Sequence, residues 1–203
     1  MPFPAFFDDA PRLRVKDPLA EFLGAPADGV IDYCYADAVR LAGHSCPTVA
    51  GAWLMTVKAM AKLWPEGLPE RGAVTVLLDD PQDEGVTGVM GAVAGLVTGA
   101  AGAGGFKGIA GRFGRDGLLR FGGDTGAVMT FRRTDTGAGV QASYHPELVP
   151  ADPEMRSSMH KVLVGYAEPE DLQRFSTLWQ DRVRRILVEH ADDPGLVRLA
   201  AIC

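Results

Sequence analysis

The sequence predicts an α+β fold, because helix-like and strand-like patterns occupy separate parts of the 203-residue chain. Apolar residues recur every three or four positions over 47–64, which is the spacing of one helical face. Residues 73–78 (AVTVLL) form a short apolar run typical of a buried strand, and 126–144 indicate a hairpin. Helical patterns return after the proline-containing break at 150–153.

Composition and charge exclude several classes of protein. Hydrophobic residues make up 47% of the chain and charged residues 23%, which is ordinary for a soluble globular protein. The net charge of −6 argues against a large nucleic-acid surface. The longest apolar run, 89–103, is too short to cross a bilayer, and Met1–Asp9 lacks the basic segment of a signal peptide. We therefore expect no nucleic-acid partner and no membrane partner.

The three cysteines do not form a disulfide framework. Cys34, Cys46 and Cys203 give an odd count at wide spacing, which together with the missing signal peptide predicts a reducing, cytoplasmic location. Cys34 faces inward on a predicted helix and is interpreted as a buried structural thiol. Cys203 is the last residue and is interpreted as incidental.

The first part of the chain predicts an irregular arm followed by a helix. Residues 1–28 contain five prolines and form a predicted N-terminal arm with one short helix near 19–23. Helical spacing over 29–42 predicts the first long helix, with Asp28 as its N-cap and Gly43 ending it. The main domain is predicted at 29–150.

The last part of the chain is predicted to be a C-terminal helical extension at 151–203. A first helix is expected over 154–163 and a second over 170–190. Pro169 lies where the second helix would begin, and proline suits the first position of a helix.

Residues 85–111 are unusually rich in glycine. The helical pattern at 86–99, with Asp83 or Glu84 as a possible cap, places several glycines on nearly one face. Each glycine within a helix costs about 1 kcal/mol relative to alanine, so this face predicts close approach by another group. Two interpretations stay open: tight packing against the chain's own backbone, or contact with a second subunit or a flat ligand.

The loop that follows this helix is basic but lacks a phosphate-binding signature. Residues 103–111 contain Gly-Gly-Phe-Lys-Gly, which does not match the Gly-x-x-x-x-Gly-Lys-Ser/Thr pattern. Lys107, Arg112 and Arg115 could nevertheless hold an anion.

The motif Gly-His-Ser-Cys-Pro at 43–47 combines an imidazole and a thiol at a helix start. Pro47 fits the first helical position, where a missing N–H loses no hydrogen bond. The unpaired amides and the positive end of that helix favour the thiolate form of Cys46. A thiolate beside the His44 imidazole suits a soft metal site or a nucleophilic cysteine.

These residues resemble a known family. The motif at 43–47, followed by Gly51 in an apolar helix, resembles the Gly-His-x-Cys-Pro signature of the FmdE-like family of formylmethanofuran dehydrogenase proteins. Phe113-Gly114-Arg115, Gly117-Leu118-Leu119 and the segment 126–131 are similar to the downstream strand region of that family. The resemblance covers residues 29–145.

The resemblance implies helices packed on one mixed or antiparallel sheet, a homodimer, and a metal site, usually zinc. It also implies an accessory role beside molybdenum or tungsten redox enzymes, and thus a possible redox-enzyme partner. Two positions depart from the family pattern. Ala42 stands where many members have a further histidine, and Thr87-Gly88-Val89 stands where many have Asp-x-Cys.

We therefore predict His44 and Cys46 as metal ligands, with His145 as the best candidate for a third. A closed zinc site needs four ligands, and the motif supplies two. His145 follows the second hairpin strand and precedes a proline and a glutamate, although it could equally be a sheet-end histidine. The remaining ligands would come from distant residues or from a second subunit.

Three alternatives to zinc binding stay open. Cys46 could be an enzyme nucleophile with His44 as its base. Haem or another iron cofactor could lie against the glycine-rich helix at 86–99, with a histidine or cysteine as axial ligand. The chain could also be a structural subunit that docks a larger enzyme through that helix and the C-terminal extension.

Overall fold

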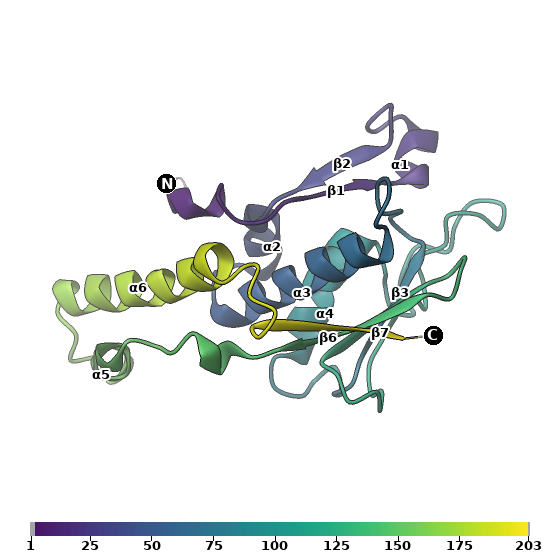
Figure 1. Ribbon diagram of the computed structural model, residues 1–203. Coiled ribbons are helices and arrows are strands. Elements are labelled where there is room, and N and C mark those ends of the chain that lie inside the picture. Colours follow the sequence, from purple (N-terminus) through teal and green to yellow (C-terminus); the bar gives the residue numbers. More distant parts are fainter. Residues whose placement is uncertain (1–2, 203) are drawn as a thin grey trace.

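The computed structural model describes residues 3–202 and shows an α+β fold, as predicted. A five-stranded sheet has the order β4-β3-β5-β6-β7, and a separate two-stranded sheet pairs β1 with β2 (Figure 1). The elements are η1 (Ala5–Phe7), β1 (Leu13–Lys16), α1 (Pro18–Leu23), β2 (Val30–Tyr33), α2 (Tyr35–Ala42), α3 (Pro47–Leu63), β3 (Val74–Leu78), α4 (Thr87–Thr98), β4 (Leu119–Arg120), β5 (Met129–Arg133), β6 (Gly139–Tyr144), η2 (Pro146–Leu148), α5 (Pro153–Leu163), α6 (Pro169–Arg184), the π-helical turn η3 (Arg185–Glu189) and β7 (Val197–Ile202).

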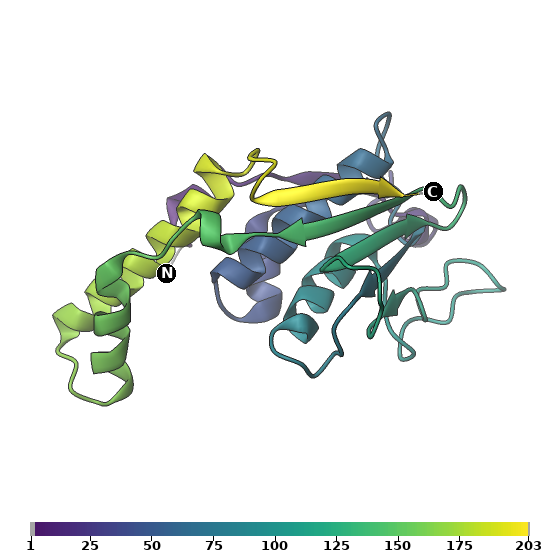
Figure 2. The same ribbon diagram turned by 60° about the horizontal axis from the view of Figure 1, so that its bottom comes forward.

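The main sheet is mixed. β3, β5, β6 and β7 are antiparallel to one another in that order, whereas β4 runs parallel to β3. The predicted strand at 73–78 and the predicted hairpin at 126–144 are confirmed as β3 and as β5 with β6. The helices α3 and α4 pack against each other and against this sheet (Figures 1 and 2).

The C-terminal segment is not wholly helical. The two predicted helices are confirmed as α5 and α6, which form a hairpin extending away from the sheet (Figure 2). The chain then returns as β7, which pairs with β6 along its full length, from Val197 opposite Tyr144 to Ile202 opposite Gly139. The sequence analysis missed this strand. Cys203 lies outside the described residues.

The predicted helix at 29–42 is wrong in its first half. Residues 30–33 form β2, because Val30 and Ile31 pair with β1 of the N-terminal arm, which was expected to be irregular there. Asp28 accepts a hydrogen bond from the Val30 amide in a turn at 3.0 Å and does not cap a helix. The helix α2 begins only after Cys34, which forms a capping box with Asp37.

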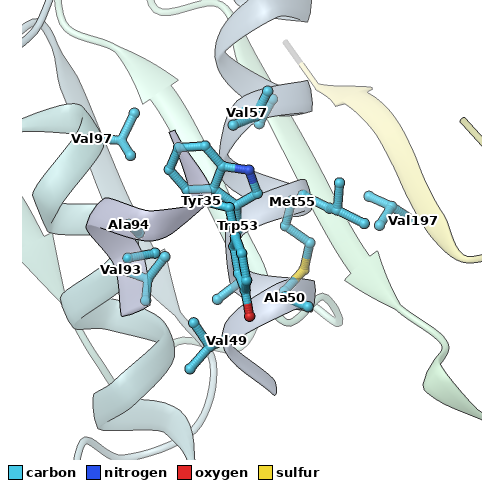
Figure 3. Close-up of a cluster of buried hydrophobic side chains, with 14 of the residues drawn as sticks. Tyr35, Val49, Ala50, Trp53, Met55, Val57, Val93, Ala94, Val97 and Val197 are labelled. Carbon is cyan, nitrogen blue, oxygen red and sulfur yellow. The ribbon is translucent and has the colours of Figure 1, made fainter. Parts of the chain in front are cut away.

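The core is organised around α3. Trp53 and Tyr35 are fully buried, with ring centroids 6.4 Å apart, and Figure 3 shows them among apolar side chains of α3, α4 and β7. The Trp53 indole donates a hydrogen bond to the Pro11 carbonyl at 2.9 Å, which fixes the N-terminal arm to the core. A Cβ at Gly51 would overlap the Tyr144 ring, so glycine allows α3 to contact β6 closely.

The glycines of α4 are explained by packing within the chain. A Cβ at Gly88 would lie 2.9 Å from the Gln82 carbonyl oxygen, and one at Gly91 would lie 2.7 Å from the Phe121 ring. At Gly95 the Ala100 carbonyl oxygen would be 2.7 Å away. The chain's own atoms thus fill the small-residue face. The N-cap of this helix is Val86, without a side-chain hydrogen bond, so neither predicted acidic cap forms.

Among residues 3–202, no helix combines the length and apolar character that a membrane crossing requires.

Candidate functional site at the start of α3

The motif at 43–47 forms a tight turn between α2 and α3. Gly43 adopts a φ of 77°, a left-handed conformation that ends α2 and that glycine accepts at little cost. Pro47 is the first residue of α3, as predicted, and Cys46 is its N-cap. The Cys46 sulfur accepts a hydrogen bond from the Val49 amide at 3.4 Å. The thiol therefore points at the start of the helix, where unpaired amides favour negative charge.

A pocket of about 470 Å³ opens at this turn and brings the two predicted ligands together. Both His44 and Cys46 line it. Its full lining is His44, Cys46, Pro47, Thr48, Tyr144, Pro146, Trp179 and Arg182. The pocket thus lies between the start of α3, the end of β6 and α6.

His44 is exposed, and its ring orientation is fixed by the backbone. The His44 Nδ1 lies 3.0 Å from the Ala42 carbonyl oxygen. A carbonyl oxygen can only accept, so this contact requires the proton on Nδ1, and in the neutral ring the Nε2 lone pair is then free. Metal-binding histidines commonly show this arrangement, with the second nitrogen donating to a carbonyl or carboxylate.

Cys46 is largely buried, with 8% of its surface exposed, and its surroundings are rich in phenol groups. The Tyr35 hydroxyl lies 3.0 Å from the Ser45 hydroxyl, and the Tyr144 hydroxyl donates to the Pro47 carbonyl at 3.0 Å. Burial raises the pKa of both tyrosines, so both phenols are neutral at physiological pH. No hydrogen bond joins His44 to Cys46 in the described part of the chain, so His44 is not positioned as a base for the thiol.

The far wall of the pocket comes from α6. The Trp179 indole and the Gln180 amide both donate to the Ser45 carbonyl, at 2.9 and 3.2 Å. Arg182 donates to the Val149 and Pro146 carbonyls at 2.8 and 3.0 Å. The Trp179 and Gln180 contacts attach α6 to the motif turn, whereas the Arg182 contacts attach it to the segment that follows β6. Sequence reasoning missed Trp179 and Arg182, because no local spacing connects them with the motif.

Comparison with known proteins places the motif in a family. The sequence model described as FmdE, molybdenum formylmethanofuran dehydrogenase operon, matches residues 41–193, which is more than half of the chain. The chain belongs to the FmdE family. The FmdE match begins in α2 and continues beyond η3, so it includes α5 and α6, which the resemblance at 29–145 left out.

Among solved structures, this FmdE chain is similar to a tungsten formylmethanofuran dehydrogenase FmdE-like protein from Syntrophus aciditrophicus. The identity is 17% and the TM-score 0.44, over 84% of this chain and 72% of the other. The comparison with curated proteins gives no match.

The structure does not bring His145 into the FmdE motif pocket. Its neighbours Tyr144 and Pro146 line the pocket, but the His145 side chain does not. The His145 Nδ1 lies 3.1 Å from a Glu147 carboxylate oxygen, and its buried Nε2 has no hydrogen-bond partner among residues 3–202. The prediction that His145 is a third ligand in the same chain therefore lacks support from the geometry.

Residues 3–202 of one copy of this FmdE chain do not form a closed zinc site. Across the described residues, no group of three or more histidine, cysteine, aspartate or glutamate side chains could hold a metal ion. Cys34 is engaged elsewhere, since its sulfur donates to Asp37 at 3.4 Å within the cap of α2. In the pocket lining, His44 and Cys46 are the only histidine and cysteine, which is two of the four ligands that a closed zinc site needs.

Proposed function

We propose that this FmdE-family chain binds a transition-metal ion, Zn²⁺ in the first place, through His44 Nε2 and Cys46 Sγ. The hydrogen bond from His44 Nδ1 to the Ala42 carbonyl carries the proposal, because it leaves the Nε2 lone pair available to coordinate a metal ion. His44 and the Cys46 thiol line the same pocket. The exposed position of His44 gives an ion access from solvent. Zinc accepts nitrogen and sulfur ligands in this combination.

We further propose that a second copy of the chain supplies the other two ligands. Two motif turns related by a two-fold axis would give a site of two histidines and two cysteines, which is a common tetrahedral set for zinc. This arrangement agrees with the lack of a third ligand within residues 3–202. When bound in such a closed site, zinc supplies structural stability and not catalysis.

In this proposal the homodimer is an accessory subunit for a redox enzyme in the cytoplasm. The description of the family, which places it in a formylmethanofuran dehydrogenase operon, supports an enzyme partner. A reducing compartment would keep Cys46 available as a thiolate ligand.

Metal analysis of protein purified without chelators tests the proposal. We expect about one zinc per two chains, because two half-sites make one four-ligand site. The His44→Ala and Cys46→Ser variants should each retain less than about a tenth of that amount. His160→Ala is the matched control, since His160 is an exposed histidine on α5, outside the pocket.

The results of the metal measurement distinguish metal binding at the motif turn from the sharing of the site between two copies. Metal content unchanged in His44→Ala, or no metal in the wild-type protein even after zinc is added, would contradict metal binding at this turn. One zinc per chain would support the metal ligands but contradict the site shared between copies. If the protein is empty of metal yet copurifies with a larger enzyme, the structural-subunit alternative is favoured.

The cysteine-nucleophile alternative rests on the hydrogen bond from the Val49 amide to the Cys46 sulfur. Alkylation by iodoacetamide that is rapid and independent of pH above about pH 6 would favour it. The haem alternative has lost its main argument, because the glycine face of α4 is filled by Gln82, Phe121 and Ala100.

A further inference from the structure

A second pocket, of about 460 Å³, lies between α1 and the loop that precedes β4. Figures 1 and 2 show α1 and this loop at the other end of the molecule from α6, and hence away from the motif turn. The pocket is lined by Pro18, Glu70, Arg71, Gly72, Arg112, Phe113, Gly114 and Arg115. Its volume is within the range of sites for small organic ligands.

Positive charge predominates in this pocket. Arg71 and Arg115 each donate to one oxygen of the buried Asp17 carboxylate, both at 2.8 Å. Glu70 adds a second carboxylate at the exposed rim, whereas Arg112 adds a third guanidinium. Three positive groups thus face two negative groups, and one positive charge is left without compensation.

The three arginines differ in how many donors they have free. Each of the three Arg71 nitrogens makes a hydrogen bond, since Nη1 donates to Asp17 and Nε and Nη2 donate to the Leu96 carbonyl at 3.3 and 3.1 Å. Arg115 keeps only 7% of its side chain exposed, and its buried Nε has no hydrogen-bond partner among residues 3–202. The Arg112 guanidinium forms no hydrogen bond or ion pair within the same range, and it lies 4.7 Å from the Phe113 ring centroid. Buried donors are nearly always satisfied, so the Arg115 Nε is an exception within residues 3–202, and the same side chain lines the pocket.

The backbone around the pocket is shaped to hold these arginines. A Cβ at Gly72 would overlap the Arg115 guanidinium, so only glycine allows the arginine to occupy this place. Phe113 has a φ of 64°, which is uncommon for a residue other than glycine. Its ring packs on Phe22 of α1, with centroids 5.3 Å apart, and this contact holds the loop against the helix.

We propose that this pocket binds the anionic end of a small organic molecule, a carboxylate or a phosphate, through Arg112 and Arg115. Guanidinium groups match the oxygens of both anions and bind them more strongly than neutral donors do. The Phe113 ring provides an apolar wall for the organic part of the ligand. This site is independent of the metal proposed at His44 and Cys46.

Titration calorimetry with phenyl phosphate, benzoate and the neutral benzyl alcohol tests this proposal. Either anion should bind with a Kd of about 1 mM or tighter, and the alcohol should bind at least tenfold more weakly. The tighter of the two anions identifies whether the site prefers phosphate or carboxylate. Arg112→Ala should weaken binding of that anion about tenfold or more, because a charge-assisted hydrogen bond is lost.

Two further variants make the result interpretable. Arg14→Ala removes an exposed arginine of β1 outside the pocket and should leave the Kd unchanged. Arg115→Lys keeps a positive charge near Asp17 but lacks the planar fork, and it should also weaken anion binding about tenfold. The proposal is overturned if no anion binds up to about 10 mM, if benzyl alcohol binds as tightly, or if Arg112→Ala binds like the wild type.

Discussion

At the scale of single residues, Asp17 joins three parts of the chain. It is 2% exposed, it accepts hydrogen bonds from Arg71 and Arg115, and it caps α1 through the Leu19 and Ala20 amides. Because both arginines are partly or largely buried, removing the carboxylate would leave their charges unpaired. Asp17→Asn should lower the free energy of unfolding by about 3–5 kcal/mol, measured by urea denaturation at pH 7.

The effect of Asp17 should depend on pH in a defined direction. Burial raises the pKa of Asp17, but hydrogen bonds from Arg71 and the Ala20 amide, with the nearby charge of Arg115, outweigh burial and hold the pKa below its ordinary value. A lowered pKa stabilises the fold above the unfolded-state value of about 3.9, and this stability is lost as pH falls further. The difference between wild type and Asp17→Asn should therefore shrink below about pH 4.

Asp32→Asn is the matched control for Asp17. Asp32 pairs with Arg12 at 3.0 Å, but both side chains are about half exposed. Its loss should change the free energy of unfolding by about 1 kcal/mol or less. An equal effect of the two substitutions would contradict the special role of the buried carboxylate.

Site residues that belong to a local sequence motif could be predicted, and those that only the fold brings together could not. His44 and Cys46 were found because their spacing and Pro47 are local signals, and the structure places both in one pocket. Trp179 and Arg182 were missed because only the folding of α6 onto the turn brings them there. Asp17 was missed because the burial of a carboxylate in a proline-rich arm depends on two arginines far along the chain.

At the scale of elements, substitutions in β7 test directly how this strand pairs with β6 in the sheet. Val197 is 3% exposed on the core side of the strand, whereas the next residue, Arg198, is exposed on the other side. Val197→Asp should lower the free energy of unfolding by about 3 kcal/mol or more, because it buries an unpaired charge. Arg198→Asp should change it by only about 0.5 kcal/mol.

Thermal unfolding followed by circular dichroism would measure both β7 variants. If the two substitutions are equally tolerated, the pairing of β7 with β6 or its register is wrong, since a shift of one residue would exchange the buried and exposed faces.

Elements with local signals were predicted, and those that depend on distant partners were not. The apolar stripe of α3, the β-branched run of β3 and the hairpin turn were readable from sequence alone. β7 has a short and mixed pattern, and it becomes a strand by pairing with β6. The segment 30–33 has both helical spacing and β-branched residues, and pairing with β1 decided between them.

At the scale of the whole molecule, the proposed shared metal site predicts assembly that depends on zinc. If two copies share four ligands, adding zinc to metal-free protein should raise the measured mass from one chain to two. Light scattering after size-exclusion chromatography would measure the mass, and a chelator should reverse the change. His44→Ala should keep the same mass with and without zinc. A wild-type mass that is indifferent to zinc would contradict the shared site.

The most direct test of metal binding at the motif turn is zinc K-edge X-ray absorption of the zinc-loaded protein. We expect a mixed first shell, with sulfur at about 2.3 Å and histidine nitrogen at about 2.0 Å. In Cys46→Ser the sulfur distance should disappear, and in His44→Ala the histidine contribution should be lost. A first shell without sulfur, or an unchanged spectrum in Cys46→Ser, would contradict the claim that this turn holds the metal.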